Sequence, residues 1–243
     1  MRSRHGEGYG PHLLGFRRDA QGSRADLTRQ LRIAGAIALT YVLLGIIYSV
    51  VSPVLEPPDE LSHYPFVKYV ADGNGLPVQS PGEDAAWAQE GSQSPLYYLL
   101  AAGLTFWIDT DDLSEVRRVN PHARIGIPLA QDNKNIVIHT RKEHFPWRGT
   151  VLAVHLIRLF SVALGLVTVW CTYALALRAF PQGHPVALGA MTFTALNPQF
   201  IFISGSVNND NLVIAVSSLV LVILGGVVQR GASPAELAAL GAL

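Results

Sequence analysis

Four long stretches of the chain contain no charged residue, and they dominate its pattern of polar and apolar positions. They cover residues 33–55, 159–177, 185–207 and 212–229, each about 18 to 23 residues long. At 1.5 Å per residue, an α-helix of that length crosses the roughly 30 Å of hydrocarbon in a bilayer. The pattern therefore predicts an all-α integral membrane protein, built as a polytopic helical bundle.

Composition and charge agree with this class and give the bundle an orientation. Hydrophobic residues make up 49% of the 243 residues and charged residues only 15%, which excludes an ordinary soluble domain. Seven arginines and three acidic residues precede Ile33, a net charge of +4, whereas residues 56–148 include eight basic and thirteen acidic ones, a net charge of −5. Because basic residues gather on the cytoplasmic side, we expect a cytoplasmic N-terminus and an extracytoplasmic first loop. Arginines directly before a span, without interleaved aromatic residues, indicate topology and no nucleic-acid partner.

These signals divide the chain into five parts. We expect a disordered cytoplasmic segment at 1–30, a first transmembrane helix at 31–55, a large extracytoplasmic loop with juxtamembrane helices at 56–150, three transmembrane helices at 151–230 and the start of a further helix at 231–243. The chain stops inside that last apolar segment, which predicts that it is the N-terminal fragment of a longer protein.

Short helices are predicted inside the first loop. Residues 59–63 fit one helical turn, Pro65 should interrupt it, and a second helix should cover residues 66–72. The apolar stretch 95–108 is short for a span and favours a helix at the outer interface. If this stretch does not cross, the arginines that end the later spans are cytoplasmic, as the positive-inside bias prefers. If it does cross, they lie outside.

The most concentrated chemistry directly follows the first span, in the run Pro57-Pro58-Asp59-Glu60-Leu61-Ser62-His63. Ionisable groups next to hydrocarbon are costly, so Asp59 and Glu60 are candidate catalytic residues. His63 lies four residues after Asp59, on the same side of a helical turn. A second interpretation is equally open, because proline followed by acidic residues is also typical of the first turn of a surface helix.

Further polar groups are expected at the same face. The turn Asn208-Asn209-Asp210-Asn211 joins two spans, and Arg158 lies at the outer end of another. Asn209 and Asp210 are candidate substrate-binding residues, although such residues also favour turns and helix N-caps. Arg158 is either a cation for an anionic substrate or a side chain that reaches the lipid headgroups.

No residue is assigned as a metal ligand from the sequence. His139 and His144 match no tight ligand spacing, and the single cysteine, Cys171, lies in a predicted span, so we interpret the two histidines as a surface pair. A divalent cation shared by Asp59, Asp210 and a lipid phosphate is an alternative, because hard cations take carboxylate and phosphate oxygens.

Several short motifs form a series along residues 33–230. The first span is followed by Asp59-Glu60, a large loop, Gln93-Ser94-Pro95-Leu96-Tyr97-Tyr98-Leu99-Leu100, Ile157-Arg158-Leu159-Phe160-Ser161, Asn197-Pro198-Gln199-Phe200 and Asn208-Asn209-Asp210. This series resembles the GT-C superfamily of membrane glycosyltransferases, most closely its protein O-mannosyltransferase and aminoarabinose-transferase branch and related bacterial membrane proteins. The acidic pair is the most specific element. Phe160 departs from the family, which has proline there.

The resemblance implies transfer of a sugar from a polyprenyl-phosphate donor to a hydroxyl of a glycan, lipid or protein acceptor, with inversion at the anomeric carbon. The reaction would take place at the outer face of a bacterial-type plasma membrane. The resemblance implies Asp59 as general base, Glu60 as its partner, and Asp210 as an acid that binds the acceptor or a metal. His63 and Asn209 are grouped with the substrate-binding residues.

Residue chemistry agrees with this reaction. An inverting transfer needs a carboxylate for the acceptor proton and a cation for the departing phosphate, and Arg158 is the candidate cation. Family members are much longer, so this chain alone would lack part of the donor site. A non-enzymatic scaffold or assembly subunit is the competing class, and part of a transporter ranks third. A scaffold should tolerate Asp59→Asn, whereas an enzyme should not.

Overall fold

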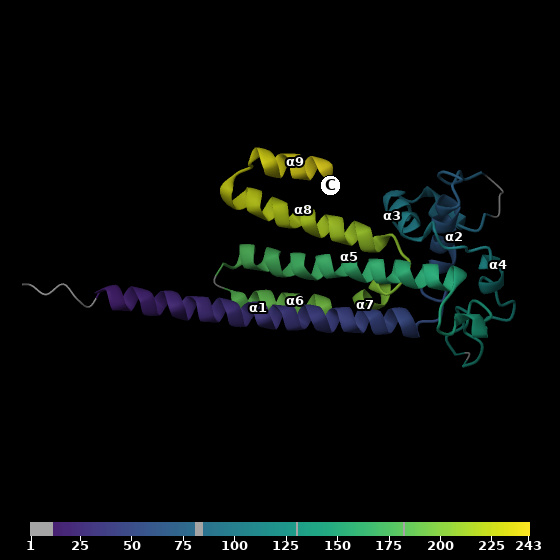
Figure 1. The fold of residues 1–243 in the computed structure, drawn as a ribbon, viewed down its shortest axis with the longest axis horizontal. Helices are drawn as coiled ribbons and strands as arrows, with labels where there is room; N and C mark the ends of the chain where they lie inside the picture. Colours follow the sequence, from purple (N-terminus) through teal and green to yellow (C-terminus); the bar gives the residue numbers. More distant parts are fainter. Residues whose placement is uncertain (1–11, 81–84, 130, 182) are drawn as a thin grey trace, which may run out of the picture.

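The computed structural model describes residues 12–80, 85–129, 131–181 and 183–243, with side chains from residue 26 onward. Three long helices, α1 (His12–Val51), α5 (Gly149–Ala179) and α8 (Asp210–Arg230), lie side by side with α5 in the middle (Figure 1). These three are long and apolar enough to cross a membrane, and the bent pair α6 (His184–Ala195) and α7 (Pro198–Ser204) gives a fourth if it counts as one span. The predicted all-helical architecture with several candidate spans is confirmed.

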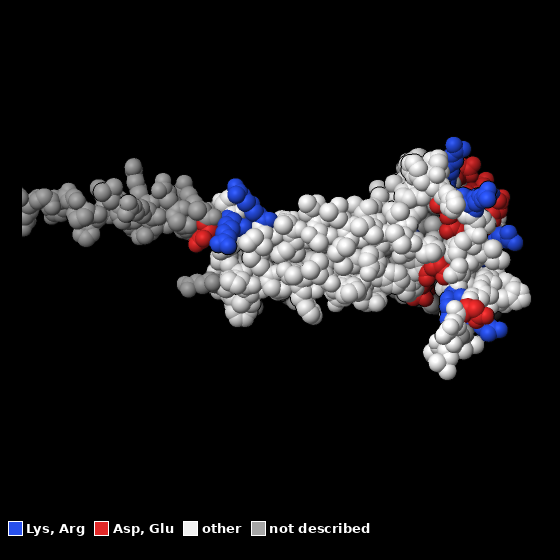
Figure 2. All heavy atoms as spheres, turned by 90° about the horizontal axis from the view of Figure 1, so that it is seen from below, with Lys and Arg blue, Asp and Glu red and all other residues white. Residues whose placement is uncertain are grey.

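Charged side chains are distributed as a membrane bundle requires. On the face drawn in Figure 2, the middle of the bundle shows no Lys, Arg, Asp or Glu, and these residues gather toward its two ends. One end carries the long connection between α1 and α5, residues 52–148, and we call it the loop end. The other end holds the turns that follow α5 and α8 (Figure 1).

The fourth candidate span is broken, whereas the sequence predicted one continuous helix over 185–207. α6 and α7 meet at an angle of 59°. Pro198 lacks the N–H that would continue the helical hydrogen bonds. The side-chain oxygen of Asn197 instead accepts from the backbone N–H groups of Gln199 and Phe200, at 3.0 and 3.3 Å, and so begins a new helix.

The first helix begins much earlier than the sequence predicted. Disorder was expected over 1–30, but α1 is helical from His12 onward, and residues 1–11 lie outside the described part. Extending a helix costs little once the apolar span has nucleated it, and residues 12–30 contain no proline. Their polar composition therefore marks the end of the span but does not end the helix.

The described residues of the loop end form five short helices: α2 (Glu60–Ala71), η1 (Ala88–Ser92), α3 (Leu96–Thr105), α4 (Leu113–Val116) and η2 (Arg141–Glu143). α2 packs against α3 and η1, and α3 in turn packs against α5. α3 has 10 residues, about 15 Å of helix, which is too short to cross a bilayer. Its exposed side chains include Leu99, Leu104 and, just beyond its end, Trp107. The last helix, α9 (Pro234–Ala242), packs against α8.

Pro65 does not divide α2, contrary to the prediction of two separate helices. A proline inside a helix leaves the carbonyl four residues earlier without its donor. Here that carbonyl belongs to Leu61, and it accepts from Nε of Arg117 at 3.1 Å. The guanidinium replaces the missing backbone donor, so α2 continues through the proline to Ala71.

His139 fastens the end of the loop back to the end of α1. Its Nε2 lies 2.9 Å from Oε1 of Glu56, and its Nδ1 lies 2.9 Å from both carboxylate oxygens of Glu143. Glu56 also accepts from the backbone N–H groups of Ile136 and Val137, at 2.9 and 3.0 Å. His144, the other histidine of this stretch, is exposed and has no part in these bonds.

Helices α1, α5 and α7 approach one another closely at Gly165. The Tyr41 hydroxyl lies where a side chain on Gly165 would lie, and a Cβ there would also come within 2.7 Å of Oγ of Ser204. Tyr41 itself is fully buried and donates to the carbonyl oxygen of Val162 at 3.3 Å. Glycine at 165 therefore lets a tyrosine of one helix fit directly against the backbone of another.

We predict that Gly165→Ala destabilises the bundle by about 1–3 kcal/mol, as expected when a well-packed contact is overfilled. The measurement is thermal unfolding of the purified chain in detergent. Gly189→Ala, also within a helix, is the matched control because a Cβ there would meet nothing within 4 Å. This control should be as stable as the parent chain or slightly more so, since alanine favours helix. Equal stability of the two variants would contradict the packing argument.

Candidate functional site

A buried ion pair forms the frame of the loop end. The carboxylate of Glu60 and the guanidinium of Arg158 are both fully buried, and two N–H groups of the guanidinium donate to the two carboxylate oxygens, at 2.6 and 3.0 Å. Glu60 lies in the first turn of α2 and Arg158 lies in α5. This two-pronged arrangement is the strongest geometry available to an arginine and a carboxylate.

The remaining bonding capacity of both side chains is also used. Glu60 accepts from the backbone N–H groups of Leu55 at 2.9 Å and Val207 at 2.8 Å. The other three donors of Arg158 go to the carbonyl oxygens of Ser49, Ser52 and Pro53, at 2.7 to 3.0 Å. All five donors of the guanidinium and all four acceptor positions of the carboxylate are therefore occupied.

This geometry changes the expected roles of two residues. Arg158 neither reaches outward to lipid headgroups nor offers a free donor to a phosphate, because it is fully buried and every N–H is bonded. Glu60 is likewise inaccessible as an acid or base. We interpret the pair as the element that fixes the end of α1, the start of α2 and the turn before α8 relative to α5.

Asp59 differs sharply from its neighbour Glu60. It occupies the N-cap position of α2 with φ +59°, in the left-handed region, and its carboxylate makes no capping hydrogen bond. Its backbone carbonyl oxygen accepts from the N–H groups of Ser62 and His63, both at 2.8 Å. The side chain is exposed. The helix start that the sequence offered as the second interpretation is confirmed, since α2 begins at Glu60 directly after Asp59, but the carboxylate of Asp59 takes no part in capping and remains free for another role.

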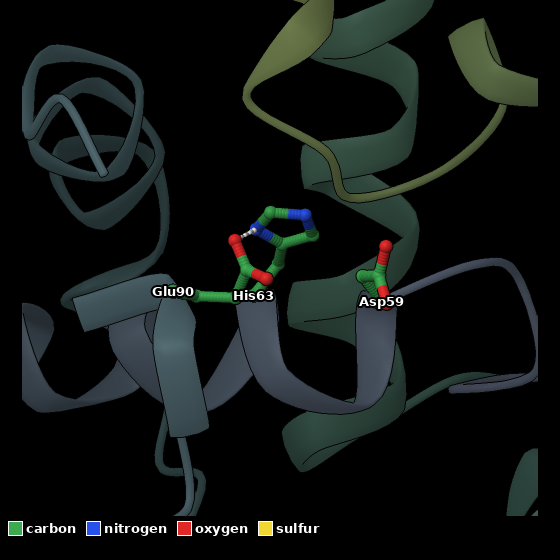
Figure 3. A group of neighbouring side chains, drawn as sticks. All are labelled: Asp59, His63 and Glu90. Carbon is green, nitrogen blue, oxygen red and sulfur yellow. Dashed lines mark ion pairs between the residues drawn. The ribbon is translucent and has the colours of Figure 1, made fainter. Parts of the chain in front are cut away.

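Asp59 lies beside a buried histidine and a buried glutamate. Asp59, His63 and Glu90 each present one ligand atom, and the three atoms lie within 4.8 Å of one another. Figure 3 shows the imidazole of His63 between the carboxylates of Glu90 and Asp59. Nδ1 of His63 lies 2.8 Å from the Tyr98 hydroxyl and 3.5 Å from Oε2 of Glu90. The spacing of Asp59 and His63 predicted their proximity, and the structure adds Glu90.

Burial and the nearby negative charges shift the pKa of His63 in opposite directions. Desolvation lowers the pKa of the imidazole and outweighs the carboxylates of Glu90, Asp59, Asp210 and Glu60, which raise it. The imidazole is therefore neutral near pH 7, where one ring nitrogen keeps a lone pair. Burial likewise raises the pKa of Tyr98, so its hydroxyl stays protonated.

The second predicted group, the turn before α8, contacts residues next to this site. Asp210 is exposed, and its charge acts on the pKa of His63. Asn209 is buried and donates to Oε1 of Gln93 at 3.3 Å, so its amide has a structural partner. The N–H of Asn208 donates to the hydroxyl of Tyr97 at 3.2 Å. Motifs that are more than 100 residues apart in sequence are thus in contact.

Comparisons with known proteins provide no relative: no family model, no curated protein and no solved structure matches the chain. The site is therefore interpreted from its own geometry. That geometry brings together Asp59, His63, Glu90 and Asp210 at the loop end, beside the buried frame of Glu60 and Arg158.

We predict that Arg158→Gln destabilises the chain by about 3–5 kcal/mol, because it leaves the buried carboxylate of Glu60 without its charge partner. Thermal unfolding in detergent and the yield of monodisperse protein measure the effect. The control is Arg118→Gln, at an exposed arginine of the same loop, which should change the free energy of unfolding by no more than about 0.5 kcal/mol. An Arg158→Gln chain as stable as this control would show that the pair does not hold the loop end together.

Proposed function

We propose that the chain is, or is part of, a membrane glycosyltransferase. It would move a sugar from a polyprenyl-phosphate donor to an acceptor hydroxyl at the outer membrane face, with inversion. The observation that carries the proposal is the contrast within the acidic pair. One carboxylate, of Glu60, is saturated inside the fold, and the next one, of Asp59, is exposed and makes no capping bond. The resemblance of the surrounding motifs to the GT-C superfamily supports the same reaction.

Asp59 is the general base in this proposal. The acceptor hydroxyl gives its proton to the Asp59 carboxylate as its oxygen forms the new bond to the anomeric carbon. The bond from that carbon to the carrier phosphate breaks on the opposite side, and its electron pair leaves with the phosphate. Proton transfer to a positioned carboxylate contributes about 10²–10⁴-fold to such reactions.

The position of the site suits a donor held in the membrane. Asp59 follows α1 by eight residues, and the apolar helix α3 lies next to α2 with Leu99 and Leu104 exposed. A lipid-linked phosphate at the bilayer surface could therefore approach the loop end while its chain stays in hydrocarbon. The left-handed backbone of Asp59, unusual outside glycine, also supports a functional role, since such conformations cluster at functional sites.

The strongest test is Asp59→Asn, which we expect to lower transfer by at least about 100-fold, because an amide cannot accept the acceptor proton. Membranes containing the chain are supplied with radiolabelled polyprenyl-phosphate sugars, and label is followed into water-soluble and lipid acceptors. Expression should be unchanged, since asparagine tolerates the left-handed conformation. Asp111→Asn, at a side chain that is 96% exposed, is the matched control and should retain full transfer.

Full activity of the Asp59→Asn chain would exclude Asp59 as the base. Stable expression of the parent chain without transfer from any donor would favour the competing class, a non-enzymatic scaffold. A scaffold would still depend on the buried pair of Glu60 and Arg158 for its fold, but it would not use the free carboxylate of Asp59.

A further inference from the structure

The surroundings of His63 contain negative charge without a matching positive side chain. Glu90 is 4% exposed, yet its only ion-pair partner in the described part of the chain is the imidazole of His63, at 3.5 Å. No lysine or arginine among the described residues forms an ion pair with Asp59, Glu90 or Asp210. Buried carboxylates are normally paired with a cation or bound to a metal. Arg158 is not available to pair with these carboxylates, because its guanidinium is already bonded to Glu60.

We propose that Asp59, His63 and Glu90 bind a divalent cation of the Zn²⁺ class. One atom of each residue lies within 4.8 Å of the other two. Around a tetrahedral Zn²⁺, with bonds of roughly 2.0–2.2 Å, neighbouring ligand atoms lie about 3.3 Å apart. Small side-chain movements therefore close the present triangle around an ion. Three protein ligands leave the fourth position open, as in zinc sites that bind a further molecule.

The nitrogen ligand decides which cation fits. Mg²⁺ and Ca²⁺ bind through oxygen atoms, whereas imidazole suits Zn²⁺ and related transition metals. His63 is nearly fully buried beside Glu90, and its imidazole gives the group the nitrogen ligand that these metals prefer. This site differs from the alternative weighed from the sequence, in which Asp59 and Asp210 share a cation through oxygen atoms alone.

Tyr98 acts as a positioning residue for the ring. Its hydroxyl bonds to Nδ1 of His63 at 2.8 Å, and its own ring stacks on Phe66 with a centroid distance of 3.8 Å. This bond holds the imidazole beside Glu90, whose Oε2 lies 3.5 Å from the same ring nitrogen. A second partner of this kind is what fixes the tautomer and direction of most metal-binding histidines.

The bound cation would also provide the positive charge that a departing phosphate requires and that Arg158 cannot supply. This part rests on the proposed function, whereas the binding of the metal does not. Asp59 has two carboxylate oxygens, so one can bind the ion while the other accepts the acceptor proton. Asp210, exposed at the rim of the site, adds negative charge without being needed as a ligand.

The test is Zn²⁺ binding by the full chain in detergent, after treatment with EDTA and dialysis, measured by titration calorimetry and by metal content. We expect one tightly bound Zn²⁺ per chain that excess Mg²⁺ does not displace. His63→Gln and Asp59→Asn should each weaken binding at least tenfold, and Tyr98→Phe should weaken it about tenfold, the lower end of the effect of losing an outer partner of a ligand. Asp59 is exposed, so its variant keeps the test valid even if His63→Gln fails to fold.

His144→Gln and Asp111→Asn are the matched controls, since both residues are exposed on the same loop. Equal Zn²⁺ affinity in the parent, the site variants and these controls would overturn the inference, and so would displacement of Zn²⁺ by excess Mg²⁺. Because binding is measured without any sugar donor, the two proposals fail separately. Site-specific Zn²⁺ binding without transfer would leave the metal site standing, whereas transfer by a chain that binds no Zn²⁺ would remove only the metal site.

Discussion

The loop end depends on the ion pair between Glu60 and Arg158. Removing two charges from water costs several kcal/mol for each ion, and mutual attraction offsets this only when every remaining bond is made. Here every bond is made, to segments on both sides of the pair in the sequence. These bonds join the end of α1, the start of α2 and the turn before α8 to α5. A buried pair of this kind contributes more to selecting one structure than to the free energy of unfolding.

The same pair determines what the neighbouring residues can do. The carboxylate of Glu60 is fixed inside the fold, whereas Asp59, directly before it, has a positive φ and lies at the N-cap position of α2. Its carboxylate is then exposed beside His63, one helical turn further along α2. Two adjacent acids thus acquire different chemistry from their backbone geometry. One becomes part of the frame, and the other becomes available to a ligand.

The sequence predicted the parts of the fold that depend on local composition. Charge-free runs are long enough to identify α1, α5 and α8 without any tertiary information, and the spacing of Asp59 and His63 placed them together. Predictions failed where a distant residue decides the outcome. α2 continues through Pro65 because Arg117 donates to the freed carbonyl, and Arg158 is buried because Glu60 reaches it from 98 residues away. Glu90 had no local signal, since it lies in a polar stretch that has the composition of a linker.

Charge balance connects the frame to the ligand chemistry of the site. With Arg158 neutralised by Glu60, the carboxylates of Asp59, Glu90 and Asp210 have no lysine or arginine ion partner in the described part of the chain. A phosphate about 5 Å from a single carboxylate is repelled by roughly 3 kcal/mol at an effective dielectric constant of 20. Further carboxylates at similar distances add to this repulsion, so a cation at the site would favour binding of the lipid phosphate in the proposed reaction. The imidazole of His63, placed between the carboxylates of Glu90 and Asp59, is the group that could hold such a cation.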